Sequence, residues 1–267
     1  HFTIHSFPTR RSSDLDMDEW AEITEGDPVM VRGKVSEGWT PNDEATPPNE
    51  LDIYDVQQLG RPHPILEHLN PTYPGDLDEL DERFEQLIED IEHPGVRRFV
   101  ERFFEDGAPL EQFRTCPAGL GQHHAYIHGL YEHTIEMTEM ARDLAGQPGV
   151  AEYANEDVII AGGLIHDAGK IHEYEWEGQP IGMDDDSLLY GHITTGPLMA
   201  QRTWNENREE LEDLGFTPEH LKHLMHIQIS HHDKQEWGSP TSPATVDAKC
   251  VAQADLASSR VRKMTEI

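Results

Sequence analysis

Leu164-Ile165-His166-Asp167-Ala168-Gly169-Lys170 is the stretch that decides the fold of this 267-residue chain. A run of helical periodicity over residues 156–165 ends directly at His166 and Asp167, with Gly169 behind them as a helix-end signal. Imidazole and carboxylate groups can hold Mn²⁺, Fe²⁺ or Zn²⁺ and leave positions open for water. The stretch therefore predicts one part of a metal centre within a helical domain.

Further residues of metal-ligand type recur along the second half of the chain. They fall in five blocks, each on the inner face or at an end of a different expected helix. Burying several such groups without partners would cost roughly 2–7 kcal/mol each, and a shared metal centre removes that cost. The predicted ligands are His133, His166, Asp167, His192, His231, His232 and Asp255.

The order of these ligands suggests two ions. Asp167 is the natural bridging carboxylate because one carboxylate can contact two metals. His133, His166 and Asp255 would complete the first ion, and His192 with the pair His231–His232 would complete the second. Two ions can stabilise both the attacking and the leaving oxygen of a phosphoryl transfer.

Residues for substrate are less strongly indicated. Lys170 follows closely on Asp167. In so acidic a chain, a lysine beside metal ligands is expected to contact an anionic phosphate. Lys170 and Asp167 are therefore the predicted catalytic residues. Trp237 and Ser239 lie in a segment that we interpret first as a turn. The alternative interpretation is a stacking platform for a base. His124 is either a substrate contact or a residue at the start of a helix.

The charge balance argues against one common way of binding nucleic acid. The chain has 20 Lys and Arg residues against 52 Asp and Glu residues, a formal charge of −32. The acidity is spread along the chain, which indicates a solvated surface and, most simply, a salt-rich, halophilic cytoplasm. This acidity argues against a broad basic face, but it does not exclude a nucleic-acid end held in a metal-lined pocket.

The two cysteines, Cys116 and Cys250, lie far apart and lack metal-binding spacing. They favour a reducing compartment without disulfides. No apolar run approaches the length of a membrane helix, and no secretory signal is recognised. We therefore expect a cytoplasmic protein without a membrane partner. A homo-oligomer is compatible with the sequence.

The periodicity divides the chain into four parts. Residues 1–16 resemble a foreign leader, 17–60 a truncated β segment, 61–115 a linker with helices, and 116–267 the domain with the metal ligands. Strands are expected at Val29–Val35 and Leu51–Val56. Helices are expected at about 77–91, 96–104, 124–144, 156–165, 195–210, 218–228 and 246–261, with an irregular segment at 109–121. The predicted fold class is therefore mostly α.

At the ligand residues the chain resembles the HD-domain metal-dependent phosphohydrolases, whose defining pattern is matched by His133, His166-Asp167 and Asp255. With His192 and His231-His232 it is similar to the binuclear members. More narrowly, it resembles the YhaM-type 3′-to-5′ exoribonucleases. The segments that carry this resemblance are His123-His124-Ala125-Tyr126-Ile127, Gly129-Leu130-Tyr131-Glu132-His133-Thr134, Leu164–Lys170, Gly191-His192-Ile193, Ser230-His231-His232 and Glu236-Trp237-Gly238-Ser239-Pro240.

The resemblance implies an HD-domain helical bundle, here preceded by a truncated OB-like β segment. It also implies a metal-bound hydroxide that cleaves phosphodiester bonds from the 3′ end of single-stranded RNA, or of DNA, releasing mononucleotides. Two divalent ions are expected, Mn²⁺ first, with Fe²⁺, Co²⁺ or Zn²⁺ as alternatives. One departure is His128, at a position where the family more often has glycine.

Two other functions stay open at this point. One is an HD phosphohydrolase that acts on a free nucleotide or a cyclic dinucleotide. The other is a non-catalytic nucleic-acid-binding module with a structural metal. The mixed His and Asp ligand set argues against the second, because structural zinc sites favour cysteine and leave no open position.

Overall fold

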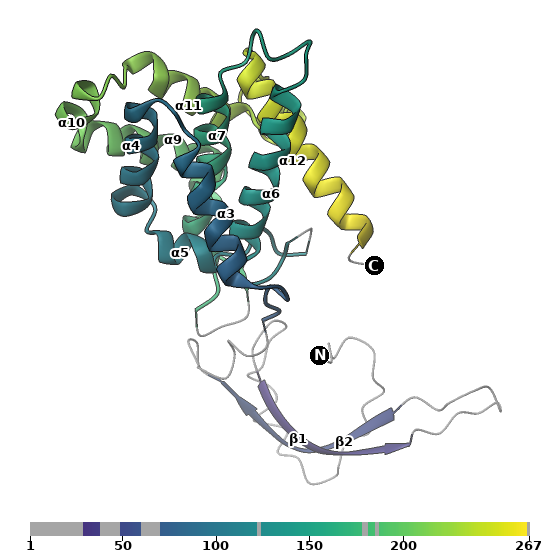
Figure 1. Ribbon diagram of the computed structural model, residues 1–267. Helices are drawn as coiled ribbons and strands as arrows, with labels where there is room; N and C mark the ends of the chain where they lie inside the picture. The colour runs from purple at the N-terminus through teal and green to yellow at the C-terminus, as the bar shows by residue number, and fades with distance from the viewer. Residues whose placement is uncertain are drawn as a thin grey trace. The chain divides into compact units, whose positions relative to one another are not determined.

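The computed structural model describes residues 29–37, 49–59, 70–121, 124–177, 181–184 and 187–265. The chain divides into two units (Figure 1). One comprises residues 1–69 with 177–179, and the other comprises residues 70–176 with 180–267. The leader predicted at 1–16 and the start of the β segment, up to residue 28, lie outside the described residues.

The described part of the first unit holds an antiparallel pair of strands, β1 (Val29–Glu37) and β2 (Asn49–Gln58). Val31 pairs with Val56, and the register shifts between Arg32 and Gly33, as at a β-bulge. Both predicted strands are confirmed, each somewhat longer than expected. An OB-like fold for this unit stays a prediction.

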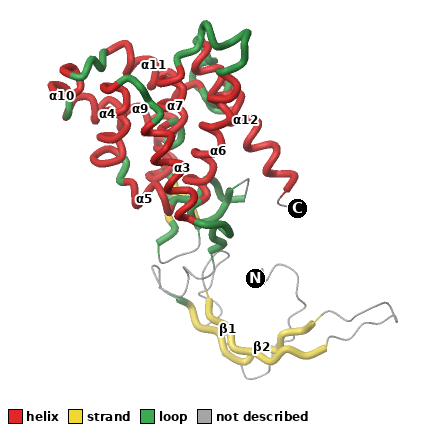
Figure 2. Tube along the Cα trace, viewed as in Figure 1, coloured by secondary structure: helices red, strands yellow, loops and turns green. Residues whose placement is uncertain are grey.

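The second unit is a bundle of helices with short strands (Figure 2). Its α-helices are α3 (Leu77–Glu89), α4 (Pro94–Arg102), α5 (Leu110–Thr115), α6 (Gly129–Ala145), α7 (Glu156–Ile165), α8 (Ser187–Tyr190), α9 (His192–Glu206), α10 (Arg208–Asp213), α11 (Pro218–Ser230) and α12 (Val246–Thr265). The remaining elements are the π-helix η2 (Phe103–Gly107), the 3₁₀ turns η3 (Ala168–His172) and η4 (Gln235–Trp237), and the strand pair β3 (Tyr174–Glu175) and β4 (Gly182–Met183). The mostly helical fold class is confirmed.

Helix α7 is the central helix of the bundle. Asn155 caps its start, accepting a hydrogen bond from the backbone N–H of Val158. Every residue from Val158 to Ile165 is buried, and the helix packs against α4, α6, α11 and α12. A helix that is apolar all round must be covered on all sides. Its C-terminal end, where His166 and Asp167 follow, is therefore enclosed by neighbouring helices.

The predicted start of the long helix at His124 was wrong, because α6 begins at Gly129. His124 and His128 both have positive φ, 54° and 71°. A residue with a left-handed backbone interrupts a helix, and this conformation normally favours glycine, which accounts for the later start of α6. The His128 ring nitrogen Nδ1 lies 2.8 Å from the Arg114 carbonyl oxygen and ties down this turn.

Helical spacing predicts that the apolar face of that helix consists of Tyr126, Leu130, Met137, Met140 and Leu144, and this prediction was wrong in part. Met140 and Leu144 are 40% and 37% exposed. Tyr126 precedes the helix, while Leu130 and Met137 are buried as expected. Because α6 packs against both α7 and α12, its buried surface is wider than a single stripe and is turned away from the predicted one.

Two other boundaries differ from the predictions. The segment 109–121 is not wholly irregular, since α5 covers Leu110–Thr115. The helix expected at 195–210 is divided at Asn207 into α9 and α10. The Asn207 side-chain amide donates to the Thr203 carbonyl oxygen at 3.1 Å, which satisfies a carbonyl at the end of α9.

The acidic surface predicts a strong dependence of stability on salt. We expect the melting temperature to rise by several degrees between 0.1 M and 1 M salt, because the Debye length falls from about 10 Å to about 3 Å. The exposed ion pairs, such as Arg202–Glu206 and Arg208–Glu212, lose strength too, but each contributes only about 0–1 kcal/mol. Calorimetry in NaCl would measure this, and a flat or falling melting temperature would contradict a halophilic origin.

Candidate metal centre

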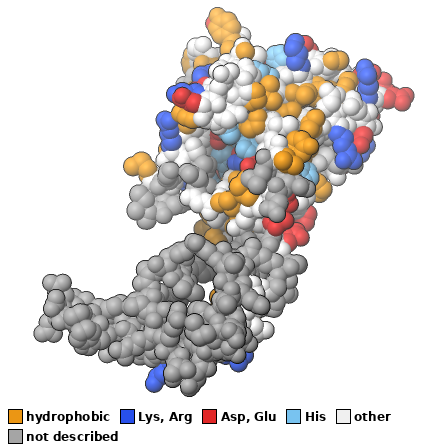
Figure 3. Space-filling model, turned by 180° about the vertical axis from the view of Figure 1, so that it is seen from behind, with side chains coloured by type: hydrophobic (Ala, Val, Ile, Leu, Met, Phe, Trp, Pro, Cys, Tyr) orange, Lys and Arg blue, Asp and Glu red, His pale blue; other side chains and the backbone are white. Residues whose placement is uncertain are grey.

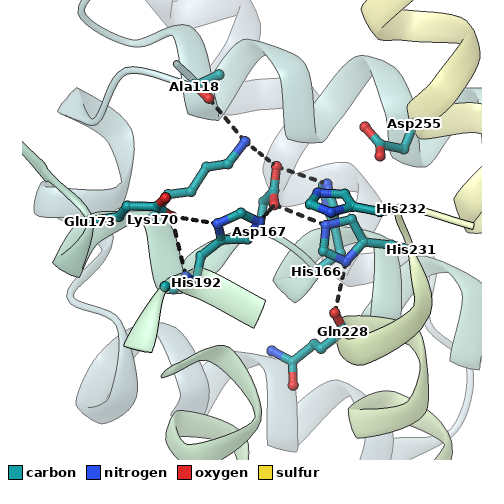
Figure 4. A network of polar contacts seen from close by, with 12 residues as sticks. Ala118, His166, Asp167, Lys170, Glu173, His192, Gln228, His231, His232 and Asp255 are labelled. Atoms are coloured by element: carbon teal, nitrogen blue, oxygen red, sulfur yellow. Dashed lines mark hydrogen bonds and ion pairs between the residues drawn. The ribbon is translucent and has the colours of Figure 1, made fainter. Parts of the chain in front are cut away.

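Asp167 lies at the centre of the predicted ligands, and its two carboxylate oxygens face different histidines (Figure 4). Oδ1 lies 3.2 Å from His231 Nε2 and 3.5 Å from His192 Nε2. Oδ2 lies 3.3 Å from His166 Nε2 and 3.8 Å from His133 Nε2. The carboxylate therefore stands between two groups of imidazoles, as a bridging ligand would.

Among the described residues, two groups of side chains that could hold a metal ion share Asp167, and a third group consists of His124, Glu132 and Glu136. One group combines Asp167 with His133 and His166, and the other combines Asp167 with His192, His231 and His232. In each group the ligand atoms lie within 4.8 Å of one another. The last predicted ligand, Asp255 on α12, has Oδ1 3.2 Å from His133 Nε2 and so adjoins the first group without belonging to it.

Several of these histidines are fixed in one tautomer by a hydrogen bond to the backbone. Nδ1 of His166, His231 and His232 lies 2.8, 2.8 and 2.9 Å from the carbonyl oxygens of Gly163, Gln228 and Trp237. Because a carbonyl oxygen only accepts, Nδ1 carries the proton and Nε2 keeps its lone pair. This is the arrangement that metal-binding histidines usually show.

The converging atoms are buried without hydrogen bonds of their own. Within the part of the chain that the structure describes, Nε2 of His166, His192 and His231 and Oδ1 of Asp167 have no hydrogen-bond partner. Their approaches to one another are close but lack hydrogen-bond geometry. A divalent ion bound by neutral imidazoles and a carboxylate would satisfy all of them, so the residues present fit the expected metal.

The electrostatics of the site favour metal binding. Burial lowers the pKa of His231, and burial with the neighbouring His231 lowers that of His232 to about 4. Burial would raise the pKa of Asp167, but Lys170 and His166 outweigh it and hold that pKa well below its usual value. His166 differs, because the Asp167 charge overcomes burial and raises its pKa; a metal cation would replace that proton.

Lys170 approaches the centre from η3. Its Nζ lies 2.7 Å from Asp167 Oδ2 and donates to the Ala118 carbonyl oxygen at 2.9 Å. The side chain is 11% exposed. Burial would lower the pKa of this amine, but the Asp167 charge raises it. Lys170 is therefore a buried cation that adjoins the Asp167 carboxylate.

Glu173 was missed by the sequence reasoning. Its Oε2 contacts His192 Nδ1 and also accepts the His192 backbone N–H at 3.2 Å. Burial alone would raise the pKa of Glu173, but the hydrogen bond and charge of His192 outweigh burial, so the pKa is lowered. The carboxylate thus holds the proton of His192 on Nδ1 and turns Nε2 towards Asp167. No spacing rule marks such a residue, although an inward-facing His192 did require an acceptor.

We expect Glu173→Ala to weaken binding of the ion at the His192 group by about 10–100-fold, the usual effect of removing a carboxylate that orients a histidine ligand. A Mn²⁺ titration followed by electron paramagnetic resonance would measure it. Glu177→Ala, which removes an exposed acid four residues further along the chain, is the matched control. Equal Mn²⁺ affinity in the two variants would contradict the role of Glu173.

The three weaker candidates for substrate contact lie in different surroundings. Trp237 is 40% exposed, whereas Ser239 is buried and its Oγ accepts the His232 backbone N–H at 3.2 Å. His124 is fully buried, with Nε2 3.5 Å from Glu136 Oε2, and its neighbour His123 lies outside the described residues. Contact of these residues with substrate stays a prediction.

The candidate centre has a route to solvent. The side chains of His192 and Asp255 are 12% and 15% exposed, unlike those of His166 and His231. Seen from behind in Figure 3, histidine side chains reach the surface among apolar ones.

Within the described residues, no helix is long and apolar enough to cross a membrane.

Residues 130–259 match the family described as the HD domain. Over these residues the chain is similar to HD domains, and the two candidate metal-binding groups that share Asp167 lie within the matched range. Among curated proteins the chain is similar to the 3′-5′ exoribonucleases YhaM of Oceanobacillus iheyensis and of a Geobacillus species. Identity is 29% to each, over 72% and 69% of this chain and 56% and 53% of those proteins.

A third relative is the 3′-5′ exoribonuclease YhaM of Bacillus licheniformis, 25% identical over 81% of this chain and 65% of that protein. The chain thus spans between about half and two thirds of the length of these curated relatives. No solved structure gives a significant match. The predicted resemblance to HD domains and to YhaM-type proteins is confirmed.

Proposed function

We propose that the chain is a metal-dependent phosphodiesterase that removes mononucleotides from the 3′ end of single-stranded RNA, or of DNA. The observation that carries the proposal is the Asp167 carboxylate, whose two oxygens face two separate groups of histidine Nε2 atoms. The relatives named as 3′-5′ exoribonucleases support the choice of substrate.

The metal sites would hold two divalent ions, with Mn²⁺ as the first candidate. His133, His166 and Asp167 would bind one ion, with Asp255 beside them, and Asp167, His192, His231 and His232 would bind the other. When bound, such ions polarise phosphate oxygens and activate a water for attack on phosphorus. They would also add positive charge to a chain whose formal charge is −32.

The protein's own groups would arrange this chemistry. The backbone carbonyl oxygens at Gly163, Gln228 and Trp237 keep the histidine Nε2 lone pairs directed at the centre. Asp167 stays ionised because Lys170 and His166 hold its pKa low. Lys170 is placed to meet a negative phosphate oxygen, because its ammonium group lies at the bridging carboxylate.

We expect Lys170→Ala to lower kcat by about 10²-fold, as loss of a charged group that stabilises the transition state does. Metal content should stay near the wild-type value, because Lys170 Nζ cannot bind a metal while protonated. Metal analysis and initial rates would measure both quantities. Lys222→Ala, at an exposed lysine paired with Glu219, is the control, and loss of metal from Lys170→Ala would contradict the phosphate role.

The function is tested by product analysis on single-stranded oligonucleotides with Mn²⁺ added. A 5′-labelled RNA should shorten step by step, while a 3′-labelled RNA should release a labelled mononucleotide at once. A parallel panel contains free nucleotides and cyclic dinucleotides. Turnover confined to that panel would replace the exonuclease by a small-nucleotide phosphohydrolase, and no turnover on any phosphate ester would leave a binding module.

A further inference from the structure

An exposed aromatic ring with two cations lies beside the candidate metal centre. Trp237, in η4, is 40% exposed. Lys234 Nζ lies 4.4 Å from the centre of its ring system, and Arg260 Cζ lies 5.9 Å from it. Lys234 belongs to the same turn as the tryptophan, whereas Arg260 comes from α12. Cations at these distances interact favourably with an indole ring.

This group of three residues, which we call the Trp237 patch, is joined directly to the predicted ligands. The Trp237 carbonyl oxygen accepts a hydrogen bond from Nδ1 of His232, at 2.9 Å. On α12, Arg260 follows Asp255 by little more than one helical turn. The main chain that fixes His232 therefore also fixes the position of the exposed ring, and a molecule bound at the metals would adjoin it.

The cations of the patch are less closely paired with carboxylates than several other arginines of the bundle. Arg83, Arg142 and Arg262 pair with Glu139, Asp90 and Glu136. Arg260 forms no ion pair with any described residue, and Lys234 is 3.6 Å from Glu236, a long separation. In a chain with 52 acidic residues and 20 basic ones, a cation such as Arg260 that has no carboxylate partner among the described residues favours an anionic ligand.

We propose that the Trp237 patch is a nucleotide subsite for the strand whose end lies at the metals. A base stacks on the exposed part of the indole, and Arg260 and Lys234 contact the backbone phosphate. Each nucleotide of a single strand offers both a flat base and a negatively charged phosphate. The occupant that we propose is therefore a single-stranded nucleic acid. This inference rests on the proposed function and adds to it how the substrate is selected.

Removing the subsite is expected to reduce the selectivity of the protein for RNA over a diester without a base. A comparison of two substrates measures this effect. One is a short single-stranded RNA, and the other is bis(p-nitrophenyl) phosphate, a diester without a base. We expect Trp237→Ala and Arg260→Ala each to lower the ratio of kcat/KM for RNA to kcat/KM for the small diester by about tenfold, within the range for base stacking. Trp237→Phe should recover part of it.

The bundle offers a matched control in a second arginine–tryptophan pair. Arg208 Cζ lies 5.5 Å from the centre of the Trp204 ring system, but Trp204 is buried. Arg208→Ala removes the same charge and should leave the selectivity ratio unchanged. Fluorescence anisotropy of a labelled RNA in EDTA gives a second readout without metal, in which Arg260→Ala should bind several-fold more weakly than Arg208→Ala.

The outcomes separate this inference from the proposed function. If the wild-type protein neither binds nor cleaves RNA, the proposed function fails. If it cleaves RNA but the ratio for Arg260→Ala and Trp237→Ala equals that for Arg208→Ala, the subsite is refuted and the function stands. Should Trp237→Ala lose its metal, the Arg260→Ala result decides alone.

Discussion

Replacing Asp167 with alanine is expected to abolish phosphodiester hydrolysis, with a loss of about 10³-fold or more, and to reduce metal binding at both sites. Its two oxygens face separate histidine groups, so one substitution removes a ligand from both. Each ion contributes several kcal/mol of transition-state stabilisation, and about 1.4 kcal/mol corresponds to a factor of ten. Metal analysis and initial rates measure the two effects.

The matched control is Asp213→Ala, which removes an exposed aspartate at the end of α10. That variant should keep wild-type metal content and rate. Asp167→Ala with full metal content and full activity would rule out the centre. Loss of metal at one group alone would show that Asp167 is a ligand to that ion and does not bridge.

Replacing Gly169 with alanine is expected to destabilise the protein and to disturb His192. A Cβ atom at position 169 would lie 2.5 Å from Thr195 Oγ1, 2.6 Å from the His192 carbonyl oxygen and 2.9 Å from the Gly196 nitrogen. Two of these atoms are backbone, which cannot rotate away. Overpacking of this kind costs about 1–3 kcal/mol, so thermal unfolding should begin several degrees lower and Mn²⁺ should bind the His192 group more weakly.

Gly149→Ala provides the comparison, because nothing lies within 4 Å of a Cβ atom built there. It should melt within about a degree of the wild type, since an exposed substitution usually changes stability by less than 0.5 kcal/mol. Equal melting temperatures and equal Mn²⁺ affinities for the two variants would show that η3 and α9 can separate without cost.

The candidate ligands could be selected from the sequence because each lies at a helix end or on a buried helix face. His166 and Asp167 follow a run of apolar residues, and His231 and His232 follow α11, which begins at Pro218. Burial of a polar group at such a position needs a partner. The sequence thus indicated which groups converge, although only the structure places the two oxygens of Asp167 towards different histidines.

Features that depend on contacts between distant segments were not predictable. Glu173 orients His192 across 19 residues of sequence, and no periodic pattern marks it. Gly169 resembled a helix-end signal, but it lies inside η3, and its lack of a side chain allows α9 to approach. Positive φ at His124 and His128 shortened α6, although the residues themselves suit a helix.

The most direct test of the two-ion centre is a crystal structure with Mn²⁺ and an anomalous difference map. We expect two peaks, one within bonding distance of His133 and His166 and one within bonding distance of His192, His231 and His232, with Asp167 contacting both. A single peak that lacks Asp167, or no peak among these residues, would contradict the account.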